Sequence, residues 1–133
     1  MSRAIATFEV TNWDESPTVQ ADGGSKVTQA SVTMSFSGDL EGDGNVEWLM
    51  AYARDEKTAS FVGLERVVGK LDGRDGTFVL QHSGTFDGAV ARAELAVVDG
   101  SGTGDLSGLT GAGRFEAGMG SDGTRRIELD YDL

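Results

Sequence analysis

The sequence has no cysteine and a single histidine, His82, among its 133 residues. Without cysteine, the chain cannot form disulfides, thiolate zinc sites or a thiol nucleophile. One histidine argues against a His-rich metal centre, and no G-x-S-x-G motif supports a serine triad. We therefore expect neither a metal nor an organic cofactor.

Basic residues and long apolar runs are also scarce. Eleven Lys and Arg face 22 Asp and Glu, which gives a formal net charge of −11 and a pI near 4.3. Such a chain is repelled by phosphate, so we exclude nucleic acid and anionic membranes as partners. No segment approaches the ~20 apolar residues of a membrane span. The beginning, "MSRAIATFEV", lacks a signal-peptide pattern, which predicts a cytoplasmic protein.

There is only one proline, whereas 20 glycines punctuate the chain, usually beside Asp or Ser. Glycines in groups such as "DGRDG" and "DGSGTG" are typical of hairpin turns. Between them, apolar residues alternate with polar ones, as in "QASVTMSFS" and "RRIELDYDL", and this alternation indicates strands with one buried face. The predicted strands are 3–13, 26–37, 45–54, 58–71, 76–86, 89–99, 112–117 and 124–132.

The length fits one domain over residues 1–133. Long strands joined by short turns favour closure, because closure removes exposed sheet edges. We therefore predict an all-β, closed, antiparallel up-and-down barrel of about eight strands.

Turn positions predict which side chains face each other. A four-residue turn at 72–75, or a two-residue turn at 73–74, places Glu65 directly opposite His82 and Phe61 opposite Phe86. A two-residue turn at 87–88 then sets His82 opposite Ala93. A loop at 54–57 brings another set of residues onto the same face, namely Val46, Trp48, Met50 and Tyr52. This face is the more apolar one, so we assign it to the interior.

The stretches "TASFVGLERVVGKLDGRDGTFVLQHSGTFDG" and "VVDGSGTGDLSGLTGAG" resemble an uncharacterised bacterial domain family grouped by fold with the allene oxide cyclase and dirigent barrels. The resemblance covers almost the whole chain. It implies an eight-stranded, allene oxide cyclase-like barrel with an axial cavity, often packed as an oligomer. Allene oxide cyclases and related bacterial cyclases fold a flexible apolar substrate in such cavities, and dirigent proteins orient radicals. No catalytic residue of these proteins maps onto this sequence.

Glu65 and His82 form the candidate catalytic pair. A carboxylate beside an imidazole can perform general acid–base chemistry near neutral pH. The alternative is a structural pair that fixes strand register or lies at an oligomer contact.

Six large side chains are candidates for the wall of a ligand cavity, and simple core packing is the alternative. The small residues Gly63, Gly84, Ala89, Ala91 and Ala93 favour an open space. The six candidates are Trp48, Met50, Tyr52, Phe61, Phe78 and Phe86.

These features favour a small-molecule-binding barrel with an apolar ligand, acting as a cofactor-independent cyclase or isomerase. A non-catalytic binding barrel and a structural oligomer are the alternatives. We read "GDLEGDGNVE" as an acidic hairpin turn and not as a calcium loop. A homo-oligomer is also expected, because apolar residues are predicted on the outer face, namely Val62, Leu64, Val79, Val90 and Val98.

Overall fold

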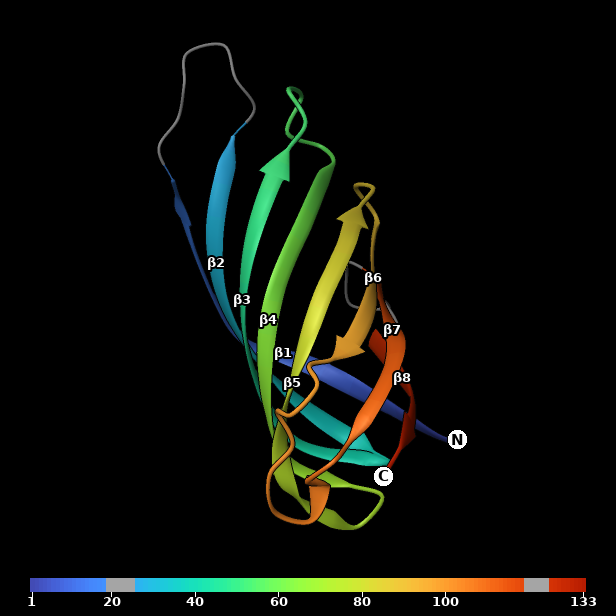
Figure 1. Cartoon of the computed structure of the whole chain (residues 1–133). Helices are drawn as coiled ribbons and strands as arrows, with labels where there is room; N and C mark the ends of the chain where they lie inside the picture. Colours follow the sequence, from blue (N-terminus) through green and yellow to red (C-terminus); the bar gives the residue numbers. More distant parts are fainter. Residues whose placement is uncertain (19–25, 119–124) are drawn as a thin grey trace.

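The computed structural model describes residues 1–18, 26–118 and 125–133. Eight antiparallel strands close into one barrel in chain order, with β1 paired to β8, as predicted (Figure 1). The strands are β1 (Ser2–Pro17), β2 (Val27–Gly38), β3 (Leu40–Tyr52), β4 (Ala59–Leu71), β5 (Arg74–Phe86), β6 (Val90–Val97), β7 (Thr110–Gly118) and β8 (Arg125–Asp132).

Burial follows the alternation of the sequence. In β2, Ala30, Val32, Met34 and Phe36 are all buried, and the intervening residues are more accessible. The predicted face of β3 also points inward, because Tyr52 pairs with Ala59 and leaves a turn at the predicted place. The interior is therefore built from one side-chain face of every strand.

The turn between β4 and β5 differs from the prediction. Leu71 pairs with Arg74, so the turn consists of Asp72 and Gly73, whose φ angles are 48° and 82°. Two consecutive positive φ angles are typical of a type I′ hairpin, which matches the right-handed twist of the strands.

This turn shifts the predicted register of β4 and β5 by two residues. His82 lies opposite Gly63, and Glu65 lies opposite Leu80, so the predicted direct opposition of Glu65 and His82 is wrong. The next hairpin is shifted in the same way, and His82 pairs with Leu95 instead of Ala93. Because two residues make one full side-chain period, both shifts leave the inward face unchanged.

One end of the barrel is closed by the connection between β6 and β7. A single 3-10 turn, η1 (Gly104–Leu106), lies in this connection, and Leu106 and Leu109 are buried there. Thr103 fastens it to β5 through hydrogen bonds to Thr77. Within the described ranges no helix is long and apolar enough to cross a membrane. We call this closed end the narrow end.

The stretch predicted as an acidic turn is mostly strand. Residues 40–47 belong to β3, and the turn is confined to Asp39, whose carboxylate accepts the Ile5 N–H at 3.0 Å. Asp39, Glu41 and Asp43 therefore do not gather in one loop.

The opposite end is wider, because the upper parts of β1 to β4 extend past β5 to β8 (Figure 1). β1 pairs with β8 only over Ser2–Thr7, and beyond Thr7 the described residues give this edge of β1 no second strand. The inner face of β1 is consequently accessible at this end, where Val10 is 40% and Trp13 is 45% exposed. We call it the wide end.

Candidate functional site

Glu65 and His82 meet inside the barrel. His82 Nε2 lies 2.9 Å from Glu65 Oε1, and the two residues are 1% and 0% exposed. The contact runs diagonally between β4 and β5, since the residue opposite His82 is Gly63. Diagonal neighbours on one face remain within reach of long side chains. The sequence thus predicted the contact and the inward face correctly, although it placed the two residues directly opposite each other and not on a diagonal.

Trp48 covers the other side of the imidazole. Its indole N–H donates to His82 Nδ1 at 3.4 Å, and the two ring centroids are 5.8 Å apart. An indole nitrogen can only donate, so Nδ1 must accept and the ring proton of a neutral imidazole lies on Nε2. His82 therefore donates to the Glu65 carboxylate, and the Nδ1 lone pair faces Trp48.

Glu65 Oε2 is buried and has no hydrogen-bond partner among the described residues. A carboxylate in an apolar interior is costly unless it is paired and hydrogen-bonded. The imidazole of His82 is thus the contact that makes burial of Glu65 tolerable.

The small residues do not leave the open space that the sequence suggested. A Cβ placed on Gly63 would lie 2.6 Å from Trp48 Cδ1, and one on Gly84 would lie 2.7 Å from Phe61 Cζ. Both distances are far below van der Waals contact, so the aromatic rings already occupy this volume. The predicted space beside these glycines is filled.

Aromatic rings form a continuous cluster around His82. Phe61 and Phe115 stack with centroids 6.2 Å apart, and Phe61 lies 5.2 Å from Trp48. Phe115 also contacts the imidazole, at 5.6 Å. The cluster separates the dyad from the wide end.

The six predicted wall residues occupy three levels. Trp48, Met50 and Phe61 are buried between the dyad and the wide end, and Tyr52 and Phe86 are half-buried at its rim. Phe78 is fully buried on the other side of the dyad, because it pairs with Val67, beyond the pairing of Glu65 with Leu80. It is a core residue apart from the other five.

Sequence reasoning missed a polar cluster at the rim. Glu15 Oε2 accepts hydrogen bonds from the hydroxyls of Thr28 at 2.6 Å and Tyr52 at 2.5 Å, and Oε1 accepts from the Trp13 indole at 3.0 Å. Trp13 in turn packs on Trp48, with ring centroids 5.6 Å apart. A line of contacts thus leads from the exposed rim to His82.

A change of register in β1 places these residues on the inner face. Val10 pairs with Met34 and Trp13 pairs with Val32, so Thr11 is an extra residue, as in a β-bulge. Without it, strict alternation would turn Asn12 and not Trp13 inward. The "TNWDESP" stretch carries no pattern that announces this shift.

The Glu15 carboxylate and the Tyr52 hydroxyl shift each other's pKa. Burial acts to raise the pKa of Glu15, but hydrogen bonds from Thr28, Tyr52 and Trp13 outweigh it and hold this pKa below its usual range. Burial and the hydrogen bond to Glu15 raise the pKa of Tyr52 to about 12. At neutral pH the rim therefore holds a carboxylate fixed by neutral donors.

Two comparisons with known proteins agree. Residues 4–131 match the model of a family described as a protein of unknown function (DUF3224). The chain belongs to the DUF3224 family. It is similar to a solved structure of a DUF3224 protein of unknown function from Shewanella oneidensis MR-1, with 31% identity and a TM-score of 0.78 over 100% of this chain and 98% of that chain. The comparison with curated proteins gives no match.

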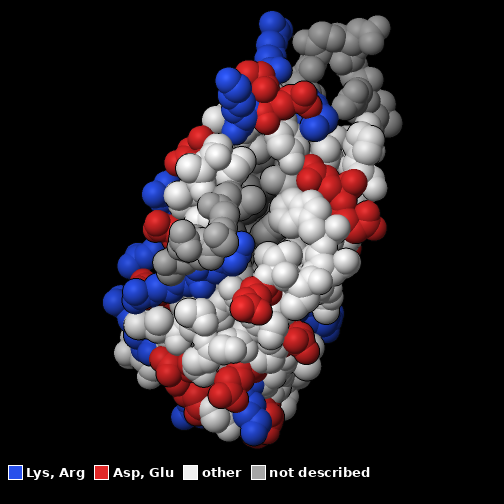
Figure 2. Space-filling model, turned by 180° about the vertical axis from the view of Figure 1, so that it is seen from behind, with Lys and Arg blue, Asp and Glu red and all other residues white. Residues whose placement is uncertain are grey.

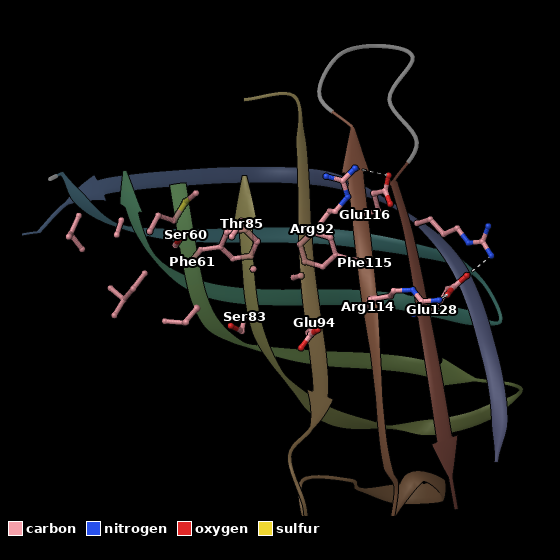
Figure 3. A pocket seen from close by; sticks show the side chains of 18 residues that line it. Ser60, Phe61, Ser83, Thr85, Arg92, Glu94, Arg114, Phe115, Glu116 and Glu128 are labelled. Carbon is pink, nitrogen blue, oxygen red and sulfur yellow. Dashed lines mark hydrogen bonds and ion pairs between the residues drawn. The ribbon is translucent and has the colours of Figure 1, made fainter. Parts of the chain in front are cut away.

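A hollow of this DUF3224 barrel lies on its outer face. It has a volume of about 920 Å³ and crosses the sheet from β2 to β8 (Figure 3). Most lining side chains point outward, because they flank the inward row of Met50, Phe61, Gly84, Ala93 and Phe115. We call it the outer groove; its outward residues include Leu49, Val62, Ser60, Ser83, Thr85, Arg92, Glu94, Arg114, Glu116, Arg126 and Glu128.

Charges of the outer groove neutralise one another. Arg92 lies 3.7 Å from Glu116, Arg114 lies 2.9 Å from Glu128, and Arg126 also contacts Glu128, at 2.6 Å (Figure 3). Three arginines of this groove thus share two glutamates, and each of the three already has a carboxylate partner. The Glu15 carboxylate at the wide end accepts its hydrogen bonds from neutral donors, and the charge of Lys26 also helps to lower its pKa.

Proposed function

We propose that this protein is a small-molecule-binding barrel whose apolar ligand lies at the wide end, against the inner face of β1 to β4. The observation that carries the proposal is Trp13, an inward-facing indole that is 45% exposed and packs at a tilt against Trp48. A large aromatic surface left in water on the concave side of a sheet is typical of a ligand wall.

Access supports the same end. Leu106 and Leu109 fill the narrow end, and the aromatic cluster fills the level of His82. From behind, the surface has a hollow that uncharged atoms border in part (Figure 2). A ligand at the wide end would contact the exposed Trp13, which packs against Trp48.

Calorimetric titration with 4-phenylbutan-1-ol tests this proposal. We expect saturable binding to the native protein, and we expect Trp13→Ala to weaken it about tenfold because it removes the exposed ring. Leu64→Ala is the matched control, since Leu64 is 54% exposed on the outer face and should leave the affinity unchanged. Absence of saturable heat, or equal affinity in Trp13→Ala, would contradict the proposal.

A cofactor-independent isomerase or cyclase of the allene oxide cyclase-like type is the second candidate. It is favoured by the tautomer of His82 in which Nε2 carries the proton and Nδ1 has a lone pair. This lone pair points toward the Trp48 indole, which lies on the wide-end side. A ligand that displaces the indole would bring an acidic C–H to Nδ1. The proton would pass from the carbon beside a carbonyl to Nδ1, which leaves an enolate and an imidazolium paired with Glu65, and reprotonation at another carbon would complete an isomerisation.

Exchange of deuterium into 4-phenylbutan-2-one in D₂O, followed by NMR, tests this chemistry. We expect the protein to accelerate exchange beside the carbonyl, and Glu65→Gln to reduce the acceleration on the order of 10²-fold by removing the charge that stabilises the imidazolium. Glu94→Gln, an exposed position, is the control. Exchange at the rate of buffer alone would exclude His82 as a base for this probe and leave the binding proposal intact.

A further inference from the structure

We infer that the wide end recognises an apolar molecule carrying a protonated amine, with Glu15 as the anion that binds it. The inference rests on the proposed function and adds the chemical class of the ligand. Such recognition requires a fixed negative charge, a free acceptor position on it and aromatic faces beside it.

The negative charge is built into the rim. The bulge at Thr11 turns Glu15 to the inner face, opposite the buried Ala30. Three neutral donors hold the carboxylate in place, and its lowered pKa keeps it ionised at neutral pH. A preoriented carboxylate costs little additional ordering when a cation binds.

One acceptor position remains. A carboxylate offers about two lone-pair sites on each oxygen. Among the described residues, Oε2 receives the hydroxyls of Thr28 and Tyr52, whereas Oε1 receives only the Trp13 indole. An ammonium N–H can therefore donate to Oε1 without displacing any of the three donors.

Aromatic faces stand beside this carboxylate. Ammonium groups are attracted to the faces of Trp and Tyr rings within about 6 Å. Lys26 already uses one such face, because its Nζ lies 4.6 Å from the centre of the Tyr52 ring while it pairs with Glu56 at 2.9 Å. The Tyr52 face is thus occupied by Lys26. The exposed Trp13 ring, whose N–H donates to Glu15, offers a second aromatic face to a bound ammonium.

The charge of the whole chain acts in the same direction. A net charge of −11 attracts cations and repels anions at long range. Glu15 would repel a ligand that carries a carboxylate, and it would offer a neutral alcohol one hydrogen bond but no ion pair. These two classes are the alternatives that the experiment separates.

The experiment compares three probes with one carbon skeleton at pH 7, namely 4-phenylbutan-1-amine, 4-phenylbutan-1-ol and 4-phenylbutanoate. Affinities are measured by calorimetry on the full chain. We expect the amine to bind about tenfold more tightly than the alcohol, and the carboxylate to bind least tightly. Glu15→Gln should lower the amine affinity about tenfold and change the alcohol affinity much less, because only the amine loses an ion pair.

Two variants keep the result interpretable. Glu9→Gln removes the same charge from the same strand at an exposed position that pairs with Ser35 on the outer face, and it should preserve the preference for the amine. Lys26→Met removes the competing cation and should strengthen amine binding alone, which provides a second readout if Glu15→Gln does not fold.

Equal binding of the amine and the alcohol would overturn the inference and leave the proposed function standing. Loss of the preference in Glu9→Gln to the same degree as in Glu15→Gln would also overturn it, because net charge would then explain the effect. Failure of all three probes to bind would instead contradict the proposed function itself.

Discussion

Replacing His82 alone by leucine is expected to lower the free energy of unfolding by about 3–5 kcal/mol, because it leaves a buried carboxylate without its partner. Glu65 is 0% exposed, and its second oxygen already lacks a hydrogen bond among the described residues. Loss of the imidazole would strand both oxygens. Urea denaturation followed by far-UV circular dichroism measures the change.

The double variant Glu65→Leu, His82→Leu is the decisive companion. Removing both members of a buried pair is often neutral or stabilising relative to removing one. The Trp48 indole loses its acceptor in the single and the double variant alike, so this cost cancels in the comparison. We expect the double variant to be more stable than His82→Leu by at least about 2 kcal/mol. A double variant no more stable than the single one would show that the pair does not carry this interaction.

Gly63→Ala is expected to destabilise the protein by about 3 kcal/mol, at the upper end of the usual cost of overpacking. The new methyl group would meet the Glu47 carbonyl of the neighbouring strand and lie 2.6 Å from Trp48 Cδ1. Backbone cannot retreat from this contact without breaking the pairing of β3 with β4. The indole would be pushed off His82, so we also expect a change in tryptophan fluorescence of the folded protein.

The control for this variant is Gly73→Asn in the turn between β4 and β5. Gly73 has φ of 82° and open space around it. Asparagine adopts this conformation in type I′ turns, so the cost should stay below about 1 kcal/mol. If Gly63→Ala proves as mild as the control, Trp48 does not pack on Gly63 as described.

The fold was predictable because each level of the sequence agrees with the next. Alternation in β2 and β8 set the strands, and the Asp–Gly groups set their ends. The inward face was also correct, although the β4–β5 register was not. The Asp72–Gly73 pair is the more specific turn signal, and choosing it would have given the observed pairing of Leu71 with Arg74.

The site was predictable only in part. Periodicity placed Glu65 and His82 on one inward face, and the predicted register missed the observed one by only two residues, so the two side chains still meet. Periodicity could not predict that the space beside Gly63 and Gly84 is filled. This depends on where the Trp48 and Phe61 rings lie in the folded barrel. Trp13 and Glu15 escaped prediction because one extra residue, Thr11, reverses the alternation, and no local signal marks it.

Membership of the DUF3224 family, as its description stands, supplies no activity for this chain. The functional account therefore depends on the wide end, where the line of contacts from Glu15 through Trp13 and Trp48 reaches His82. Trp13 and Trp48 are the two tryptophans of the chain, so their indole N–H signals report on this site without assignment of the whole protein.

The most direct test follows these two indole N–H signals by NMR during titration with 4-phenylbutan-1-ol, together with the amide signals of Ser83 and Thr85 in the outer groove. Both indole signals should move along one saturation curve, with the larger change at the exposed Trp13, while the two amides stay in place. Movement of Ser83 and Thr85 with stationary indoles would place the ligand in the outer groove and contradict the account.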